Sequence, residues 1–365
     1  MSPSRRARVA IGSALLVTVA TVALPRAVTT HSTRPLAAVV DSPRREHIPE
    51  VLSLAARRGA LRGSHALLIE TPPPTPAPTP PPPPPPPTPP PPPTAGGLRL
   101  LVDPVAFSDH SGEHGGAPAT QALAGIMVDV DTRQVIWEVR PHQSLPPAST
   151  AKVVSSLVAL ENFDPHHMVT ITPDALTQAS DETVMGIAAG QQYDVEDLLS
   201  GMLTVSANDA ATAMAADTAG FGNYVDAMNA QMQQLGLHDS HFTTPVGLDD
   251  PQQYASPYDL AAVAMEDMNR FPVFRNIVWR DQVNLPQTAT HPHFELHNLD
   301  RLLQFYPAAI GVKPGWTGNA GPCLVGMAQR GGHHLIAVVM NDPVLYSDET
   351  NLFQWGFAQY GIAPF

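Results

Sequence analysis

A serine and a lysine stand three residues apart at the start of an apolar run. Ser149 and Lys152 follow two prolines and precede a run of valine, leucine and alanine that ends at Leu160. This pattern predicts a helix over about 149–162. Residues three apart share a helical face, so the Lys152 amine can reach the Ser149 hydroxyl. The positive end of the helix dipole favours an alkoxide and a neutral lysine. The pair therefore predicts nucleophilic catalysis; the alternative is an N-cap serine beside a solvated lysine.

A second hydroxyl and an amide lie on a turn between two predicted helices. Ser206 and Asn208 connect the helical patterns 194–204 and 208–219. Side chains on such a turn can point into a cleft between elements. A helix cap at the start of 208–219 is the structural alternative, and the two roles are compatible.

A second lysine lies on a predicted strand. Lys313 is followed by Pro314, Gly315, Trp316 and Thr317. A cation placed near Lys152 would lower the pKa of that amine by repulsion and so keep it neutral. The structural alternative is an exposed lysine on a strand edge, where it discourages aggregation.

The spacing of apolar residues along the chain predicts the elements that must position these residues. Strand patterns occur at both ends of a central helical block, with glycine turns between the later strands. The strands are expected at 124–130, 134–139, 310–316, 323–329 and 335–340, and the other helices at 222–235, 257–269 and 349–360. This order predicts an α/β (α+β) fold: an antiparallel sheet flanked by helices, with an inserted helical subdomain and a site in the cleft between them.

The rest of the chain is not domain-like. Residues 1–27 have a basic start and an apolar segment, as in a signal peptide or a membrane anchor. An arginine-rich juxtamembrane segment is expected at 28–70, and proline and threonine at 71–96 predict an extended linker. Glycine, histidine and serine suggest a flexible connector over 97–121. The catalytic domain is then expected at 122–365.

Composition excludes several classes of function. The net charge is −13, and most acidic residues follow residue 70, so a nucleic-acid partner is not expected. Cys323 is the only cysteine and lies in an apolar run, which excludes a disulfide framework and favours a buried thiol. His291, His293 and His297 lack acidic partners at helical spacing, so neither a metal nor a cofactor is expected.

The three motifs, in this order and spacing, resemble those of the penicillin-recognising serine enzymes, and among them the D-alanyl-D-alanine carboxypeptidases of peptidase family S11. The resemblance covers about residue 122 to the C-terminus and includes further stretches typical of that family, at 204–210, 245–250, 258–261 and 297–303. It implies a fold like that of β-lactamases and transpeptidases, and a low-molecular-mass penicillin-binding protein.

The resemblance also implies roles for the motif residues. Ser149 would attack the carbonyl of a D-Ala-D-Ala peptide bond while Lys152 takes its proton. Ser206 would relay that proton to the leaving nitrogen. Asn208 would hold Lys152 and donate to the amide carbonyl of the substrate. All four are expected to be catalytic.

The strand motif is expected to bind substrate through Lys313, Gly315, Trp316 and Thr317. The backbone N–H groups of Ser149 and Trp316 would form the oxyanion hole. A side chain at Gly315 would block the approach of the substrate backbone. The departure is Pro314, where the family normally has threonine or serine, whose hydroxyl contacts the substrate carboxylate. A proline there fits an edge strand.

The expected function is a serine-type D-Ala-D-Ala carboxypeptidase that trims peptidoglycan stem peptides and is inhibited covalently by β-lactams. Such an enzyme works outside the cytoplasm of a bacterium, either anchored by the N-terminal segment or secreted into the wall. A DD-endopeptidase and a β-lactamase-like hydrolase are the enzyme alternatives, although residues 239–258 lack the glutamate that fast deacylation often uses. A catalytically weakened wall-binding protein is the alternative that Pro314 suggests.

Overall fold

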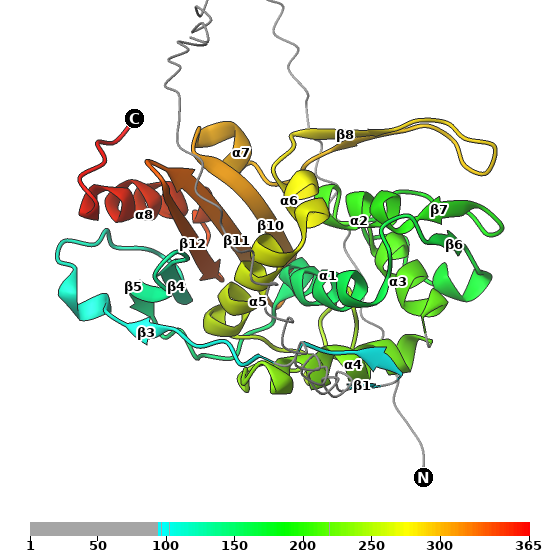
Figure 1. The fold of residues 1–365 in the computed structure, drawn as a ribbon, viewed down its shortest axis with the longest axis horizontal. Helices are drawn as coiled ribbons and strands as arrows, with labels where there is room; N and C mark the ends of the chain where they lie inside the picture. Colours follow the sequence, from blue (N-terminus) through cyan, green and yellow to red (C-terminus); the bar gives the residue numbers. More distant parts are fainter. Residues whose placement is uncertain (1–93, 96, 102, 219) are drawn as a thin grey trace, which may run out of the picture. The chain divides into compact units, whose positions relative to one another are not determined.

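The computed structural model describes residues 94–95, 97–101, 103–218 and 220–365 (Figure 1). The predicted signal peptide or anchor, the arginine-rich segment and almost all of the linker therefore lie outside the described residues. Within the described ranges, no helix combines the length and the hydropathy that crossing a bilayer requires.

A six-stranded sheet forms the centre of the described chain. Its strand order is β10-β11-β12-β4-β5-β3, so strands from the two ends of the domain meet where β12 pairs with β4. All neighbours are antiparallel except the short β3, which pairs parallel to β5. The strands are β3 (Ser108–Asp109), β4 (Ala124–Asp129), β5 (Gln134–Val139), β10 (Ala309–Thr317), β11 (Gly321–Arg330) and β12 (His333–Met340). The mainly antiparallel sheet predicted from the sequence is confirmed, with β10 at its edge.

Helices cover both faces of this sheet. The C-terminal helix α8 (Leu345–Gln359) packs Phe353 and Phe357 on one face, against Met127 and its neighbours. On the other face, α1 (Ala151–Asn162) and α5 (Pro257–Arg270) share a core with Ile126. Because adjacent residues of β4 are buried on opposite sides, that strand reads as a continuous apolar run rather than an alternating one.

The central part of the chain forms the expected inserted helical subdomain, which Figure 1 shows mostly in green, with α6 in yellow. Asp194 accepts a hydrogen bond from Asp197 N at the start of α2, and this cap fixes where the helix begins. The elements here are β6 (Met168–Thr170), β7 (Gln192–Asp194), α2 (Val195–Thr204), α3 (Asn208–Asp217), α4 (Phe221–Gln234) and α6 (Pro272–Val278). The sequence did not predict α6, β6 or β7.

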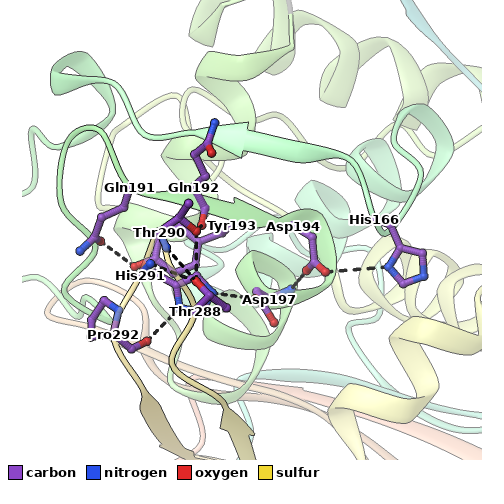
Figure 2. A network of polar contacts seen from close by, with 10 residues as sticks. All are labelled: His166, Gln191, Gln192, Tyr193, Asp194, Asp197, Thr288, Thr290, His291 and Pro292. Atoms are coloured by element: carbon purple, nitrogen blue, oxygen red, sulfur yellow. Dashed lines mark hydrogen bonds and ion pairs between the residues drawn. The ribbon is translucent and has the colours of Figure 1, made fainter.

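A hairpin that the sequence did not predict joins the helical subdomain to the sheet. Its strands are β8 (Gln282–Leu285) and β9 (Phe294–His297). Figure 2 shows how its tip is held: the His291 ring stacks on Tyr193 at 4.5 Å, and its Nε2 lies 3.5 Å from Asp197 Oδ2. Thr290 Oγ1 donates to Gln192 O at 3.0 Å. These contacts connect the hairpin to β7 and α2.

The structure differs from the sequence prediction at two boundaries. Residues expected in a flexible connector are packed, because Leu98, Leu101 and Val105 are buried in the same core as α1. A hydrogen bond from the backbone N–H of Leu101 to the side-chain Oε1 of Gln231, at 2.8 Å, also holds this stretch. Two short strands, β1 (Thr94–Ala95) and β2 (Leu98–Arg99), pair with each other there. The last helix also begins at Leu345, four residues earlier than expected.

Candidate active site

Ser149 lies in a single 3₁₀ turn, Ala148–Thr150, that leads directly into α1. Ala148 has a φ of +49°, which an L-residue adopts only when its surroundings require it. The neighbouring loop packs closely on this residue, because a Cβ on Gly247 would lie 1.8 Å from Ala148 O. The turn has little room to move. Ser149 is half-buried and lies in the wall of a cavity.

Lys152 is fully buried and contacts three acceptors. Its Nζ lies 3.0 Å from Ser149 Oγ, 2.7 Å from Asn208 Oδ1 and 3.0 Å from Val246 O. Burial lowers the pKa of Lys152 well below its ordinary value, and the charge of Lys313 lowers it further. A neutral amine in this position can accept the Ser149 proton, so the structure brings the predicted nucleophile and base into bonding distance.

Ser206 and Asn208 lie on the turn between α2 and α3, as expected. Ser206 has a φ of +61° and is buried, yet it lines a cavity together with Ser149. Asn208 is the first residue of α3, and its Nδ2 donates to Glu182 Oε2 at 2.6 Å. Sequence reasoning missed Glu182, because no motif surrounds it and its partner is 26 positions away along the chain.

Gly315 packs directly against the turn that carries the nucleophile. A Cβ on Gly315 would lie 2.8 Å from Ser149 N and 3.0 Å from Thr150 N. The sequence explains this glycine by the approach of a substrate; the structure adds the approach of the backbone of Ser149 itself. A side chain here would displace either the turn or the edge strand.

Two prolines indicate how the N–H groups of β10 are directed. Pro314 lies opposite Leu324, and Pro322 of β11 lies opposite Trp316. A proline cannot donate to the ladder, so these two pairs, two residues apart, are pairs that exchange no hydrogen bonds. The N–H of Trp316 therefore points away from β11, over the free edge of the sheet. An oxyanion donor needs this orientation.

Lys313 is fully buried next to the cleft. Burial lowers its pKa to about 7, with the negative charge of Asp300 acting in the opposite direction. Its Nζ donates to Pro314 O at 3.0 Å. Asp300 is buried as well, and burial raises its pKa to about 7. The second lysine thus lies inside the domain rather than on an exposed strand edge.

Two cavities flank Ser149. The first, of about 470 Å³, lies between the loops of the helical subdomain and the end of β10 and is lined by Ser149, Glu182, Thr183, Asn208, Val246, Asp249, Trp316, Thr317 and neighbouring residues. The second, of about 360 Å³, continues past Pro314 and is lined by Ser149, Thr183, Ser206, Leu299, Pro314, Gly315, Trp316, Pro322, Leu345 and Tyr346. Seven of the eight predicted site residues contact these cavities or one another; the eighth, Lys313, acts on Lys152 through its charge.

Cys323 and the histidines of the C-terminal strands do not line either cavity beside Ser149. Cys323 is buried, and burial raises the pKa of its thiol to about 11, which leaves little thiolate for nucleophilic attack. His334 contacts Asp131, and His333 stacks on Tyr360. Within the described ranges no three histidine, cysteine, aspartate or glutamate side chains are grouped as metal ligands would be.

Comparison with known proteins identifies the family. A sequence model of peptidase family S11, described as D-alanyl-D-alanine carboxypeptidase, matches residues 112–344. The chain belongs to this family. Members are serine peptidases that work through an acyl-enzyme, so the family expected from the three motifs is confirmed. The match begins at residue 112, ten residues before the expected start of the catalytic domain.

Curated S11 relatives cover most of the described chain. D-alanyl-D-alanine carboxypeptidase DacB2 of Mycobacterium tuberculosis is 35% identical over 249 residues, which span 66% of this chain and 84% of the relative. D-alanyl-D-alanine carboxypeptidase DacF of Bacillus subtilis is 29% identical over 279 residues, which span 73% and 70%.

Solved structures confirm the fold. A penicillin-binding protein homologue of Mycobacterium tuberculosis, 35% identical, superposes with a TM-score of 0.63 over 69% of this chain and 97% of its own. A DD-transpeptidase of Streptomyces, 28% identical, gives a TM-score of 0.63 over 67% and 99%. The expected architecture, a sheet flanked by helices, is therefore shared with these solved structures.

Proposed function

We propose that this S11 peptidase hydrolyses the terminal D-Ala-D-Ala bond of peptidoglycan stem peptides through an acyl-enzyme on Ser149. The observation that carries the proposal is the 3.0 Å contact between Lys152 Nζ and Ser149 Oγ, made by an amine whose pKa burial lowers. A nucleophile with an adjacent base of this kind is what acyl transfer requires.

Acylation begins when Ser149 Oγ attacks the carbonyl carbon of the scissile bond and its proton passes to neutral Lys152. The new C–O bond moves an electron pair onto the carbonyl oxygen. The N–H groups of Ser149 and Trp316 stabilise that oxyanion, because Gly315 brings the edge strand against the serine turn.

The C–N bond then breaks, and the leaving amine needs a proton. Lys152 holds that proton, and Ser206, which lines the cavity beside Ser149, relays it to the departing D-alanine nitrogen. Water subsequently attacks the ester carbon, Lys152 again accepts a proton, and Ser149 is released as a hydroxyl.

The substrate and the location follow from the same chemistry. Enzymes of this family act on peptidoglycan, which implies action outside the cytoplasm. A β-lactam presents a strained amide to the same serine, so it is expected to acylate Ser149 and to inhibit the enzyme. The basic and apolar residues 1–27 support either a cleaved signal peptide or a retained anchor.

Ser149→Ala tests the proposal. We expect this variant to lose both peptide hydrolysis and covalent labelling by a fluorescent penicillin, with an unchanged circular dichroism spectrum and melting temperature. Labelling that persists in the folded variant would remove Ser149 from its role. A wild-type protein that labels with neither penicillins nor cephalosporins would favour a wall-binding function instead.

A DD-endopeptidase that cuts crosslinks is a second candidate, because the cavity beside Pro314 suits a leaving group without a free carboxylate. Among the described residues that line this cavity, none is arginine, lysine or histidine. Its wall combines apolar side chains with hydroxyl groups: Leu299, Pro314, Pro322 and Leu345 on the one hand, and Thr183, Ser206 and Tyr346 on the other. A free carboxylate in such a place would lack charged partners. Digestion of purified peptidoglycan, with products identified by mass, distinguishes the two: cleaved crosslinks indicate an endopeptidase, and loss of single D-alanines a carboxypeptidase.

A further inference from the structure

A loop of the helical subdomain forms one wall of the cleft and is bonded to the start of α3. Asp209 accepts hydrogen bonds from the backbone N–H groups of residues 185–187, at 2.9 to 3.1 Å. Asn208 N donates to Thr183 O at 2.8 Å. These hydrogen bonds hold the loop against the turn that carries Ser206 and Asn208. A residue of this loop can therefore contact the Asn208 side-chain amide.

Glu182 is the residue of this loop that reaches the amide. Its Oε2 accepts from Asn208 Nδ2 at 2.6 Å, and its Oε1 accepts from Ala179 N at 2.9 Å. The side chain is half-buried and lines the same cavity as Ser149. Both carboxylate oxygens are engaged, so the position of this group is fixed.

The Asn208 side-chain amide lies between an amine, that of Lys152, and a carboxylate, that of Glu182. The Lys152 amine donates to Asn208 Oδ1 at 2.7 Å, so it lies on the side of the amide oxygen. A carboxylate can only accept, so it requires the amide nitrogen, and Glu182 occupies that side. The two contacts together select one orientation of the amide. The second hydrogen of Nδ2 stays available to a substrate carbonyl.

We propose that Glu182 is a positioning residue of the reaction, which holds the Asn208 amide in the orientation that supports Lys152 and receives the substrate. This inference rests on the proposed function, because it assigns Glu182 to the same acylation step. A chain of hydrogen bonds then runs from Ser149 through Lys152 and Asn208 to Glu182. Glu182 itself contacts no reacting atom.

The charge of Glu182 gives this role a measurable signature. Burial and the charge of Lys313 on β10 lower the pKa of Lys152, while Glu182 on the loop and Asp209 on α3 raise it. Without the Glu182 charge, the pKa of Lys152 falls further. The acid limb of the acylation rate, where Lys152 becomes protonated, then moves to lower pH.

Two substitutions separate the hydrogen bond from the charge. Glu182→Ala removes both, and we expect the second-order rate of acylation by a fluorescent penicillin to fall about 10²-fold, as misplaced catalytic groups cause. Glu182→Gln keeps a carbonyl for Asn208 Nδ2 but no charge; we expect a loss within about 10-fold and an acid limb at lower pH. Asp174→Asn, an exposed site on a 3₁₀ turn of the same subdomain, is the matched control and should change neither rate nor profile.

The outcomes are distinct from those that test the nucleophile. The inference is overturned if folded Glu182→Ala acylates at the wild-type rate, or if Glu182→Gln keeps the wild-type pH profile. It is also overturned if the variants acylate normally but accumulate acyl-enzyme, because Glu182 would then activate the hydrolytic water. Labelling of Ser149→Ala would instead refute the proposed function as a whole.

Discussion

Thr317 Oγ1 donates a hydrogen bond to Asp249 Oδ1 at 2.5 Å, which connects the end of β10 to the loop on the other side of the cavity. Asp249 Oδ2 also accepts from Asn319 N at 3.2 Å. The hydroxyl of Thr317 is therefore already engaged, and its partner is negatively charged. Thr317 does not replace the hydroxyl that the family normally has at position 314, because a substrate carboxylate would meet repulsion from Asp249.

Thr317→Val tests this connection. The substitution removes one charge-assisted hydrogen bond at a partly exposed position, so we expect a loss of about 1 kcal/mol in the free energy of unfolding. We also expect slower acylation, since the end of β10 is less restrained. Thermal denaturation and penicillin labelling measure the two effects. Thr317→Ser keeps the hydroxyl and should resemble the wild type; equal losses in both variants would contradict the explanation.

Pro314→Thr restores the hydroxyl that the family uses. We expect faster turnover of peptides that end in a free D-alanine carboxylate, by about 10-fold or more, because one hydrogen bond to a charged group contributes about 1.5 to 3 kcal/mol. The new N–H points over the free edge of β10, so the ladder to β11 is undisturbed. The same peptides with a C-terminal amide serve as the control. Unchanged or lower turnover would indicate a cavity adapted to another leaving group.

Gly315→Ala is expected to disrupt the oxyanion hole. Its Cβ would lie 2.8 Å from Ser149 N, so the edge strand or the serine turn must move. Overpacking of this kind costs about 1 to 3 kcal/mol of stability, and displaced N–H donors reduce acylation by about 10²-fold or more. Gly318→Ala is the matched control, since the nearest atom to its Cβ is 4.0 Å away. Similar behaviour of the two variants would refute the role of close packing.

The acylation rate should fall as the pH decreases. Burial lowers the pKa of Lys152 well below its ordinary value of 10.5, so the amine is neutral at pH values where a solvated lysine is charged, and its protonation at lower pH removes the acceptor for the Ser149 proton. Rates of labelling between pH 5 and 9, with an acid-stable β-lactam, measure this limb. Lys152→Arg cannot deprotonate and should not acylate at any pH, with folding checked by circular dichroism. A wild-type rate that does not fall at any pH at which the protein stays folded would exclude Lys152 as the base.

The free energy of unfolding should depend on pH through Asp197 of α2, which contacts His291 at the tip of the β8–β9 hairpin. Burial is the largest cause that raises the pKa of Asp197 to about 6, with the nearby Asp194 next, while His291 acts in the opposite direction. Because the folded pKa is above the ordinary value of 3.8, the contribution of Asp197 is fully present below about pH 4 and is lost as the pH rises through 6.

Asp197→Asn removes this titration. We expect the melting temperature of the variant, relative to the wild type, to increase between pH 4 and pH 7. Thermal denaturation of both proteins across this range measures the difference. Glu196→Gln, one residue earlier in α2, removes one carboxylate while Asp197 still titrates, and it is the control. Parallel pH curves for Asp197→Asn and the wild type would contradict the assignment.

Much of the site follows from local sequence. Ser149 and Lys152 are three residues apart, and helical geometry alone places their side chains together. Ser206 and Asn208 lie between two apolar helical patterns, and this position by itself predicts that a turn carries them. The edge position of β10 is also local in origin, because Pro314 cannot donate to a ladder on that side. The period of the apolar residues likewise predicted the sheet and the inserted helices.

Only the tertiary structure decided the contacts between distant segments. Glu182 meets Asn208 because Asp209 binds the loop that carries it, and Gly315 meets the serine turn because the sheet edge passes beside it. Residues 98–105 show no clear helical or strand period, yet Leu98, Leu101 and Val105 are buried in the same core as α1. Local propensity cannot encode such contacts, since their free energy comes from surfaces that meet only after the chain has folded.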